Sequence, residues 1–539
     1  TMAGPRPGAP DAAQKPGGQR VPKSTDPCRS LPFAVVGLGA SAGGLDAFQR
    51  FLDAVPADSG MAFVLIQHLD PTHASMMSEL LARHTEMPVV EAADGMRVEV
   101  DHVYLIPPGA YLALRDGSLW LSKPRDHHGA RMPLDFFLCS IAQECGERAL
   151  CAILSGTGTD GSLGLKAVHE QGGLVVVQDP HEAQYNGMPR SAIDTGCTDF
   201  ILPIAKIPQA LMSFSRQAYV SGRKTPGEME TESGPAEIIA LLTEMTSHDF
   251  SLYKPGTLTR RIERRMALAA IENRERYLEI LREDAGERER LARDLLINVT
   301  QFFRDRLAFD MLGQSVVPEL VQEQPPGQPI RVWVPACSSG EEAYSIAILF
   351  LEAIAASRSN IKLQVFASDI EPGCVAFARN GSYPEHIHND VTKERLSRYF
   401  IKEDGGYRVV RELREAVVFT TQNLLADPPF SRLDLISCRN VLIYLSPEAQ
   451  ERTLSLFHFA LRERGVLVLG ASETVGKHGD HFAPISKTHR LYRHIGRSRP
   501  GETAFPIPSG ELGFRSRSLS PKERASPAPT LGDLAKRTL

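Results

Sequence analysis

A serine, a histidine and an aspartate in the first 160 residues have the side chains that nucleophilic ester hydrolysis requires. Ser41 lies in Gly-Ala-Ser-Ala-Gly, which fits the G-x-S-x-G elbow that exposes a serine hydroxyl at a strand-to-helix turn. His68 ends the apolar run MAFVLIQH, and Asp160 lies in the glycine-rich stretch SGTGTDGS. Together they could act as nucleophile, general base and orienting carboxylate. Taken singly, they fit a plain tight turn, a core histidine and a helix-capping aspartate.

Each of these three residues follows a run of apolar residues that predicts a buried strand. The runs are FAVVGLGA before Ser41, MAFVLIQ before His68 and ALCAIL before the loop with Asp160. Parallel strands end at one edge of their sheet, so we expect the three side chains to converge there. N–H groups of the glycine-rich loop could form an oxyanion hole. The glycines around Ser41 do not have the G-x-G-x-x-G spacing of a dinucleotide loop.

A second candidate site lies in residues 331–345, RVWVPACSSGEEAYS. The residues predict a buried strand, a tight turn at Gly340 and a helix with two acids in its first turn. The next strand, KLQVFASD, ends in Asp369, whose carboxylate could accept both hydroxyl protons of a ribose. Neither G-x-G-x-x-G nor a Walker lysine occurs here, which favours a nucleoside without phosphates, with S-adenosylmethionine the leading candidate. The alternative is an ordinary βαβ unit.

The composition is that of a soluble chain of about three domains, with 539 residues, 42% of them hydrophobic and 23% charged. No apolar run approaches the roughly 20 residues that span a bilayer, and no signal peptide is visible. The eight cysteines include no C-x-x-C pair, which favours reduced thiols over disulfides or a metal site. We therefore expect a cytoplasmic protein without a metal and without membrane insertion.

The fold class predicted for the chain is α/β: two doubly wound, mostly parallel catalytic domains with a small all-α domain between them. We expect the natural chain to continue past residue 539 into a sensor or signalling module, because TLGDLAKRTL reads as a helix cut short. The predicted segments are a disordered tail (1–30), a first catalytic domain (31–218), a linker (219–237), a helical domain (238–320), a second catalytic domain (321–497) and a disordered tail (498–539).

Several motifs of the second half occur in the order found in one family. They are NVTQFFRD, RVWVPACSSGEEAYS, TQNLLADPPF, LDLISCRNVLIYL and GVLVLGASETVG. Residues 239–493 thus resemble the chemotaxis-receptor glutamate methyltransferases (CheR-like). The resemblance implies an S-adenosylmethionine site, with Arg304 near the methionine carboxylate, Asp369 at the ribose and Tyr444 near the transferred methyl. The implied cofactor-binding residues are Asn298, Thr300, Arg304, Glu341, Asp369, Asn423, Leu424, Asn440 and Tyr444.

The first half carries motifs of a second family. GASAGG, QHLDPTH, SGTGTDGS and NGMPRSAI follow one another within residues 33–207. This region resembles the catalytic domain of chemotaxis-receptor methylesterases (CheB-like), which implies Ser41 as nucleophile, His68 as general base and Asp160 as its partner. The chain departs from the family at Ala42, where a threonine is usual, and at Thr157, where a methionine is usual.

Four arginines of the predicted helical domain, Arg260, Arg261, Arg264 and Arg265, have the spacing of one helix face. One interpretation is a solvated helix with Glu pairs. The other is a docking face for an acidic partner, which the resemblance implies to be the glutamate-bearing helices of a receptor. Nucleic acid is a poorer candidate, because no aromatic residues alternate with these arginines.

The resemblances together predict a bifunctional chemosensory enzyme that methylates chemoreceptor glutamates and hydrolyses the resulting methyl esters, with glutamine deamidation as a further activity. Its predicted partners are the cytoplasmic helices of methyl-accepting chemoreceptors, and a partner or C-terminal module would gate the opposed activities. One alternative is a methyltransferase whose CheB-like half only binds or regulates. Another is a methyltransferase for a small acid or RNA.

Overall fold

The computed structural model describes residues 31–67, 76–123, 132–221, 233–246, 248–403 and 405–496. The domains described below belong to a single unit. In the described ranges, we find no helix that combines the length and the apolar character needed to cross a membrane.

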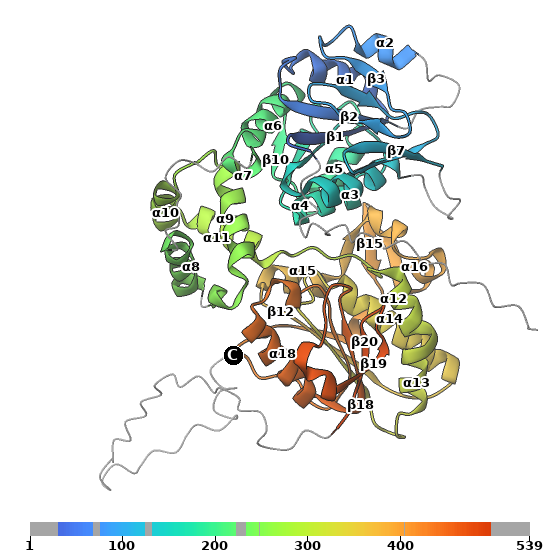
Figure 1. The fold of residues 1–539 in the computed structure, drawn as a ribbon. Coiled ribbons are helices and arrows are strands. Elements are labelled where there is room, and N and C mark those ends of the chain that lie inside the picture. The colour runs from blue at the N-terminus through green and yellow to red at the C-terminus, as the bar shows by residue number, and fades with distance from the viewer. Residues whose placement is uncertain are drawn as a thin grey trace, which may run out of the picture. The chain divides into compact units, whose positions relative to one another are not determined.

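The first domain is built on a parallel sheet of seven strands (Figure 1). In spatial order these are β10 (Phe200–Leu202), β9 (Leu174–Gln178), β8 (Ala149–Ile153), β1 (Ala34–Ala40), β2 (Met61–Gln67), β5 (Val103–Leu105) and β3 (Val89–Glu91). A small antiparallel sheet joins β4 (Met96–Arg97), β7 (Ser118–Ser122) and β6 (Tyr111–Arg115). The helices are α1 (Gly44–Asp53), α2 (Met77–Leu81), α3 (Pro133–Cys145), α4 (Ser162–Glu170), α5 (Gly187–Ile193), α6 (Ile207–Ser215) and α7 (Ala218–Ser221).

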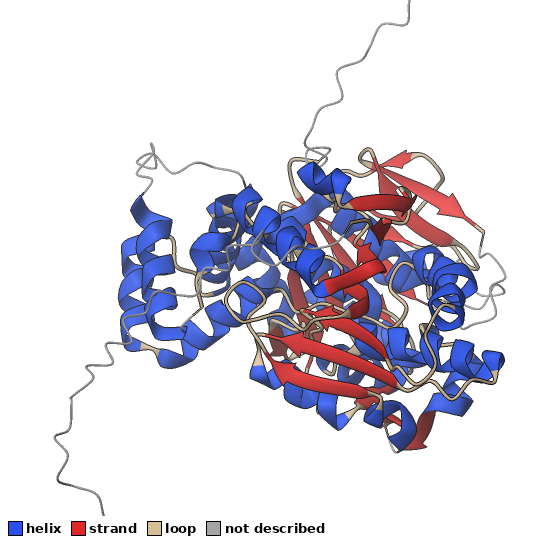
Figure 2. Cartoon of the chain, turned by 90° about the horizontal axis from the view of Figure 1, so that it is seen from below, coloured by secondary structure: helices blue, strands red, loops and turns tan. Residues whose placement is uncertain are grey.

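Helices cover both faces of this sheet, so its central strands are apolar at almost every position. All residues of β1 and β8 are buried. Val35 packs on one face with Phe137 of α3, while its neighbour Val36 packs on the other face with Phe48 of α1. In Figure 2 the strands, in red, lie between helices, in blue. The uninterrupted apolar runs of the sequence follow from this double coverage.

The glycines of β1 let α3 approach the sheet closely. A Cβ atom on Gly39 would lie 1.9 Å from Leu134 Cδ2 of α3. Gly39→Ala is therefore expected to destabilise the first domain by roughly 1–3 kcal/mol through overpacking. Urea unfolding checks this, with Gly256→Ala as control, because nothing lies within 4 Å of a Cβ at that position. Equal stability of the two variants would contradict the close approach.

The helical domain consists of four helices that pack against one another (Figure 1). The Asn273 side chain accepts a hydrogen bond from the N–H of Arg276 at the start of one helix. The Asp284 carboxylate caps the next by accepting from the N–H groups of Gly286 and Glu287. The four helices are α8 (Ser233–Thr246), α9 (Pro255–Leu268), α10 (Arg274–Glu283) and α11 (Ala285–Leu296).

The second domain has a mixed sheet of seven strands. In spatial order they are β16 (Val417–Thr421), β12 (Leu363–Asp369), β11 (Ile330–Pro335), β17 (Leu433–Cys438), β18 (Leu461–Leu469), β20 (Leu491–His494) and β19 (Phe482–Ser486); the pairs from β16 to β18 are parallel and the last two antiparallel. Its helices are α12 (Arg306–Met311), α13 (Val317–Gln322), α14 (Glu341–Ser357), α15 (Pro372–Asn380), α16 (Lys393–Tyr399), α17 (Arg411–Glu415) and α18 (Pro447–Ala460).

The predicted fold class is confirmed: two mostly parallel α/β domains flank an all-α domain. The second domain also carries a three-stranded antiparallel sheet of β13 (Ser382–Pro384), β15 (Gly406–Val409) and β14 (Phe400–Glu403). The predicted limits of the domains stay a prediction, and both predicted tails lie outside the described residues.

Candidate active sites

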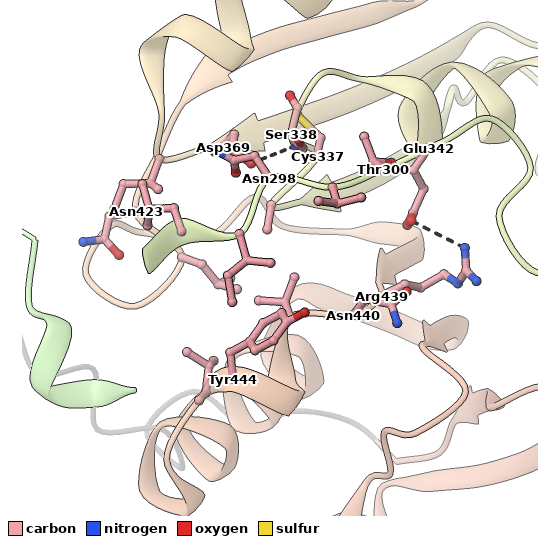
Figure 3. A pocket seen from close by; sticks show the side chains of 18 of the residues that line it. Asn298, Thr300, Cys337, Ser338, Glu342, Asp369, Asn423, Arg439, Asn440 and Tyr444 are labelled. Atoms are coloured by element: carbon pink, nitrogen blue, oxygen red, sulfur yellow. Dashed lines mark hydrogen bonds and ion pairs between the residues drawn. The ribbon is translucent and has the colours of Figure 1, made fainter. Parts of the chain in front are cut away.

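A cavity lies at the carboxyl edge of the second sheet, where β11, β12 and β17 end. Its empty space is about 930 Å³, part of which is open to solvent. The cavity brings together residues far apart in the sequence (Figure 3). Those predicted for cofactor binding that line it are Asn298, Thr300, Arg304, Asp369, Asn423, Leu424, Asn440 and Tyr444.

Asp369 ends β12 at the cavity wall and is only 4% exposed. Its carboxylate accepts hydrogen bonds from the backbone N–H of Ser338, at 2.7 Å, and of Glu371, at 2.9 Å. Burial raises the pKa of Asp369, and these N–H donors oppose the rise. Each carboxylate oxygen keeps a further lone pair, so Asp369 can still accept a pair of hydroxyl protons.

The turn between β11 and α14 follows the predicted pattern. Gly340 has φ +93°, and a Cβ there would lie 2.7 Å from the Cβ of Ala378, so this position requires glycine. Ala336 and Ser338 also have left-handed φ values, of 51° and 48°, and both line the cavity. Strain of this kind is concentrated at functional sites.

Sequence reasoning missed an ion pair in the cavity lining, between the partly buried Glu342 and the buried Arg439 (Figure 3). Arg439 Nη1 lies 3.5 Å from Glu342 Oε2, and Arg439 Nη2 bonds Asp305 at 2.5 Å. Ser437 Oγ donates to Glu342 at 2.6 Å. Burial raises the pKa of Glu342, and the Arg439 charge opposes this rise. In the sequence, this pair corresponds only to the second glutamate of Gly340-Glu341-Glu342 and the arginine of Cys438-Arg439-Asn440.

The assignment of Glu341 to the cofactor site stays a prediction. Glu341 is buried, but it is not part of the cavity lining. Its carboxylate accepts a hydrogen bond from Ser339 Oγ at 2.7 Å. Successive residues of a helix point about 100° apart, so Glu341 and Glu342 cannot face the same space. Glu342 is the one at the cavity.

The helical domain also contributes to the cavity, through His248 and Tyr253. His248 Nε2 lies 3.1 Å from the Tyr253 hydroxyl, and its other ring nitrogen lies 3.4 Å from Asn423 Nδ2. Burial lowers the pKa of His248 to about 4, so the ring is neutral near pH 7. Tyr444 stands in the same lining, and burial raises the pKa of its hydroxyl, which stays protonated. No sequence motif marked His248 or Tyr253.

The assignment of Arg260, Arg261, Arg264 and Arg265 as a docking face also stays a prediction, although three of these arginines contact other parts of the chain. Arg261 is buried and donates to the carbonyl oxygens of His169 and Glu170. Arg264 forms an ion pair with Asp199 at 2.7 Å, and Arg265 forms one with Glu287 at 2.7 Å. Helical spacing places these residues on one face but does not reveal what covers that face. Here the first domain covers Arg261 and Arg264.

Asp199→Ala is expected to destabilise the protein by about 3 kcal/mol, because it leaves Arg264 buried without its main anion. The Arg264 and Asp199 side chains are 0% and 6% exposed. Asp294, 3.5 Å from Arg264 Nη1, still faces the Arg264 charge. The loss of unfolding free energy is therefore expected at the lower end of the range for a broken buried ion pair. Urea unfolding measures it. The control Asp46→Ala breaks an exposed pair with Arg50 and should cost less than about 1 kcal/mol; equal losses would contradict the argument.

In the first domain, Ser41 lies directly after β1, against the loop that follows β8. Its N–H donates to the Ser155 carbonyl at 3.0 Å, and Ser155 Oγ donates to the Ala42 carbonyl at 3.1 Å. A Cβ on Gly156 would lie 3.0 Å from the Cβ of Ser41. The glycine-rich loop thus lies within reach of the partly exposed serine.

Asp160 is buried beside the N-terminus of α3. Its two carboxylate oxygens accept hydrogen bonds from the N–H groups of Leu134 and Asp135, at 3.1 and 3.0 Å. Burial and the neighbouring Asp135 carboxylate raise the pKa of Asp160. Asp160 therefore caps the N-terminus of α3. His68 lies outside the described residues, so the predicted triad stays a prediction.

The chain matches three family models. They are CheB methylesterase (residues 36–211), the all-alpha domain of CheR methyltransferase (236–296) and the SAM binding domain of CheR methyltransferase (298–491). The chemotaxis protein methyltransferase of Listeria innocua is 32% identical, covering 43% of this chain and 87% of that protein. An uncharacterized 104.1 kDa protein of Rhodobacter capsulatus is 39% identical, over 84% of this chain and 49% of that protein. The chain spans about half the length of this relative.

Among solved structures, the catalytic domain of Thermotoga maritima CheB methylesterase is 30% identical, covers 34% of this chain and 98% of that chain, and has a TM-score of 0.32. The family matches assign residues 298–491 to a SAM binding domain and residues 36–211 to a methylesterase domain. The chain belongs to the CheR family of chemotaxis methyltransferases and carries a CheB methylesterase domain in front. Both predicted resemblances are confirmed.

The cavity residues fit the cofactor S-adenosylmethionine. Buried polar atoms in the lining lack hydrogen-bond partners among the described residues: Ser338 Oγ, Gln422 Oε1 and Arg439 Nε. Such atoms are costly unless a ligand satisfies them. S-adenosylmethionine offers hydroxyl donors for Asp369 and a carboxylate acceptor for an arginine. The predicted cofactor agrees with the matched SAM binding domain.

Proposed function

We propose that this chain is a two-way modification enzyme that methylates glutamate side chains of chemoreceptors and hydrolyses the resulting methyl esters. The observation that carries the proposal is the polar cavity around Asp369, in a chain that also matches a methylesterase domain. The proposed substrates are cytoplasmic receptor helices. A sensor module that gates the activities stays a prediction.

In the methyltransferase domain, the chain's residues hold and align the reactants. S-adenosylmethionine, when bound, supplies a methyl group made electrophilic by its sulfonium. Asp369 would accept the ribose hydroxyl protons, and Arg304 would bind the methionine carboxylate. A glutamate carboxylate is already nucleophilic, so alignment contributes more to the rate than a strong base does. The Tyr444 hydroxyl, protonated because burial raises its pKa, can donate a hydrogen bond in this space.

In the esterase domain, Ser41 Oγ would attack the ester carbonyl carbon while His68 takes its proton. The tetrahedral intermediate then expels methoxide, which takes the proton from His68 and leaves as methanol. Water, deprotonated by His68, attacks the acyl-enzyme and releases the glutamate carboxylate and Ser41. A glutamine side chain would follow the same route and release ammonia.

A second candidate function keeps the methyltransferase and assigns the CheB-like half a binding or regulatory role. One observation favours it: burial and the neighbouring Asp135 carboxylate raise the pKa of Asp160. A protonated Asp160 would stabilise a positively charged base less than a carboxylate does. The Ala42 and Thr157 departures support the same alternative.

The test uses the full chain and receptor cytoplasmic fragments. Methyl-labelled S-adenosylmethionine should yield base-labile label on the fragment, and a pre-methylated fragment should release methanol. Label without methanol release would favour the second function. Cofactor binding without labelling of any receptor fragment would overturn the proposed acceptor and direct the search to small acids or RNA.

A further inference from the structure

The 297–305 segment, which connects α11 to α12, lies between the cofactor cavity and the esterase domain. Toward the second sheet, five of its residues line the cavity: Ile297, Asn298, Val299, Thr300 and Arg304. The same segment also contacts helix α4 of the esterase domain. One wall of the cavity is thus shared with a domain that the methyltransferase reaction does not itself require.

Three contacts join this segment to the esterase domain. Val299 packs against the apolar core beneath α3 and α4. Lys166 Nζ of α4 donates to the Thr300 carbonyl at 3.3 Å. Glu170 Oε1, at the end of α4, accepts from Arg304 Nη2 at 3.2 Å. Two charged residues of one helix therefore hold a cavity wall.

The backbone of the segment requires such support. Ile297, Phe303 and Asp305 all have left-handed φ values, of 50°, 50° and 62°. For non-glycine residues each such conformation costs roughly 1–3 kcal/mol, and for a β-branched residue it is rare. Strained backbone persists only where surrounding contacts fix it. On the esterase side, α4 supplies those contacts.

We propose that Lys166 and Glu170 are positioning residues of the methyltransferase site: docking of α4 holds the 297–305 segment in its cofactor-binding conformation. Cofactor occupancy and α4 docking then favour each other, since coupling between two sites is reciprocal. The identity of the ligand rests on the proposed function. Because α4 starts two residues after Asp160, the same helix links the cofactor cavity to the candidate esterase site.

A further hydrogen bond joins the two domains next to Asp160. Asn389 of the methyltransferase domain lies with its Nδ2 3.4 Å from Thr159 Oγ1, beside Asp160. Arg261 also donates to the carbonyl oxygens at the carboxyl end of α4 and so fixes that end. Both ends of α4 are therefore held by residues outside the esterase domain.

The first test measures binding of S-adenosylhomocysteine, the demethylated cofactor, to the full chain by calorimetry. Glu170→Gln and Lys166→Met are each expected to weaken binding about three- to tenfold, although neither residue lines the cavity. The matched control is Glu182→Gln, which removes a glutamate paired with Arg50 inside the esterase domain. Its affinity should stay at the wild-type value. Wild-type affinity in both α4 variants would overturn the proposal.

The second test is hydrogen exchange with and without S-adenosylhomocysteine, which separates coupling from a merely structural role. In the wild type, the ligand should slow exchange in residues 162–170 as well as in 298–304. In Glu170→Gln, slowing should remain in 298–304 and diminish in 162–170. Slowing confined to 298–304 in the wild type would overturn the coupling. Absence of any ligand binding by the wild type would instead overturn the proposed function.

Discussion

Replacing Ser41 with alanine is expected to reduce methanol release from a methylated receptor fragment by roughly 1,000-fold or more, as loss of a catalytic nucleophile does. Ser41 is partly exposed at the end of β1, with the glycine-rich loop against it. Alanine removes the hydroxyl and keeps the turn, since the Ser41 N–H still bonds the Ser155 carbonyl. Methyl label on the fragment should rise, because its removal stops.

Ser155→Ala is the matched control for this prediction. Ser155 is 2% exposed and its hydroxyl is committed to backbone groups of Ala42 and Tyr185, so it is a structural serine of the same site. Its loss should lower the free energy of unfolding, measured with urea, by the cost of a buried hydrogen bond, about 1 kcal/mol, with release of methanol kept within about tenfold. If Ser41→Ala releases methanol like the wild type, the nucleophile assignment is wrong.

The parts of the site that sequence alone located are those controlled by local pattern. A strand that ends in an aspartate, such as the one before Asp369, places its carboxylate at the edge where parallel strands end. The tight turn at Gly340 is equally local, because its φ of +93° favours glycine. For the same reason the strands of both sheets could be predicted from their apolar runs.

The parts that sequence missed depend on helix phase or on distant contacts. Glu341 and Glu342 are neighbours of the same type, and only the rotation of α14 decides which one lines the cavity. Arg264 bonds Asp199, which is 65 positions away, so helical spacing could not identify its partner. His248 joins the cavity from another domain, through contacts that no local motif encodes.

Asp369→Ala is expected to weaken binding of S-adenosylhomocysteine by roughly 100-fold or more. Two hydrogen bonds from hydroxyls to a carboxylate contribute about 1.5–3 kcal/mol each, and every 1.4 kcal/mol is about tenfold in affinity. The change also leaves the N–H groups of Ser338 and Glu371 without their acceptor, which loosens the turn after β11. Asp369→Asn should lose less, because its amide oxygen still accepts. Calorimetric titration of the full chain measures both affinities.

Glu341→Gln completes this test, because Glu341 is buried next to the cavity residues without lining the cavity. The glutamine can keep the hydrogen bond from Ser339, so S-adenosylhomocysteine affinity should remain within about twofold of the wild type. Glu342→Gln, by contrast, removes the charge that faces Arg439 and should weaken binding clearly more. If Glu341→Gln proves the more damaging of the two, α14 has a different phase in the ligand-bound protein, and the cavity would then be lined by Glu341 as its family resemblance implies.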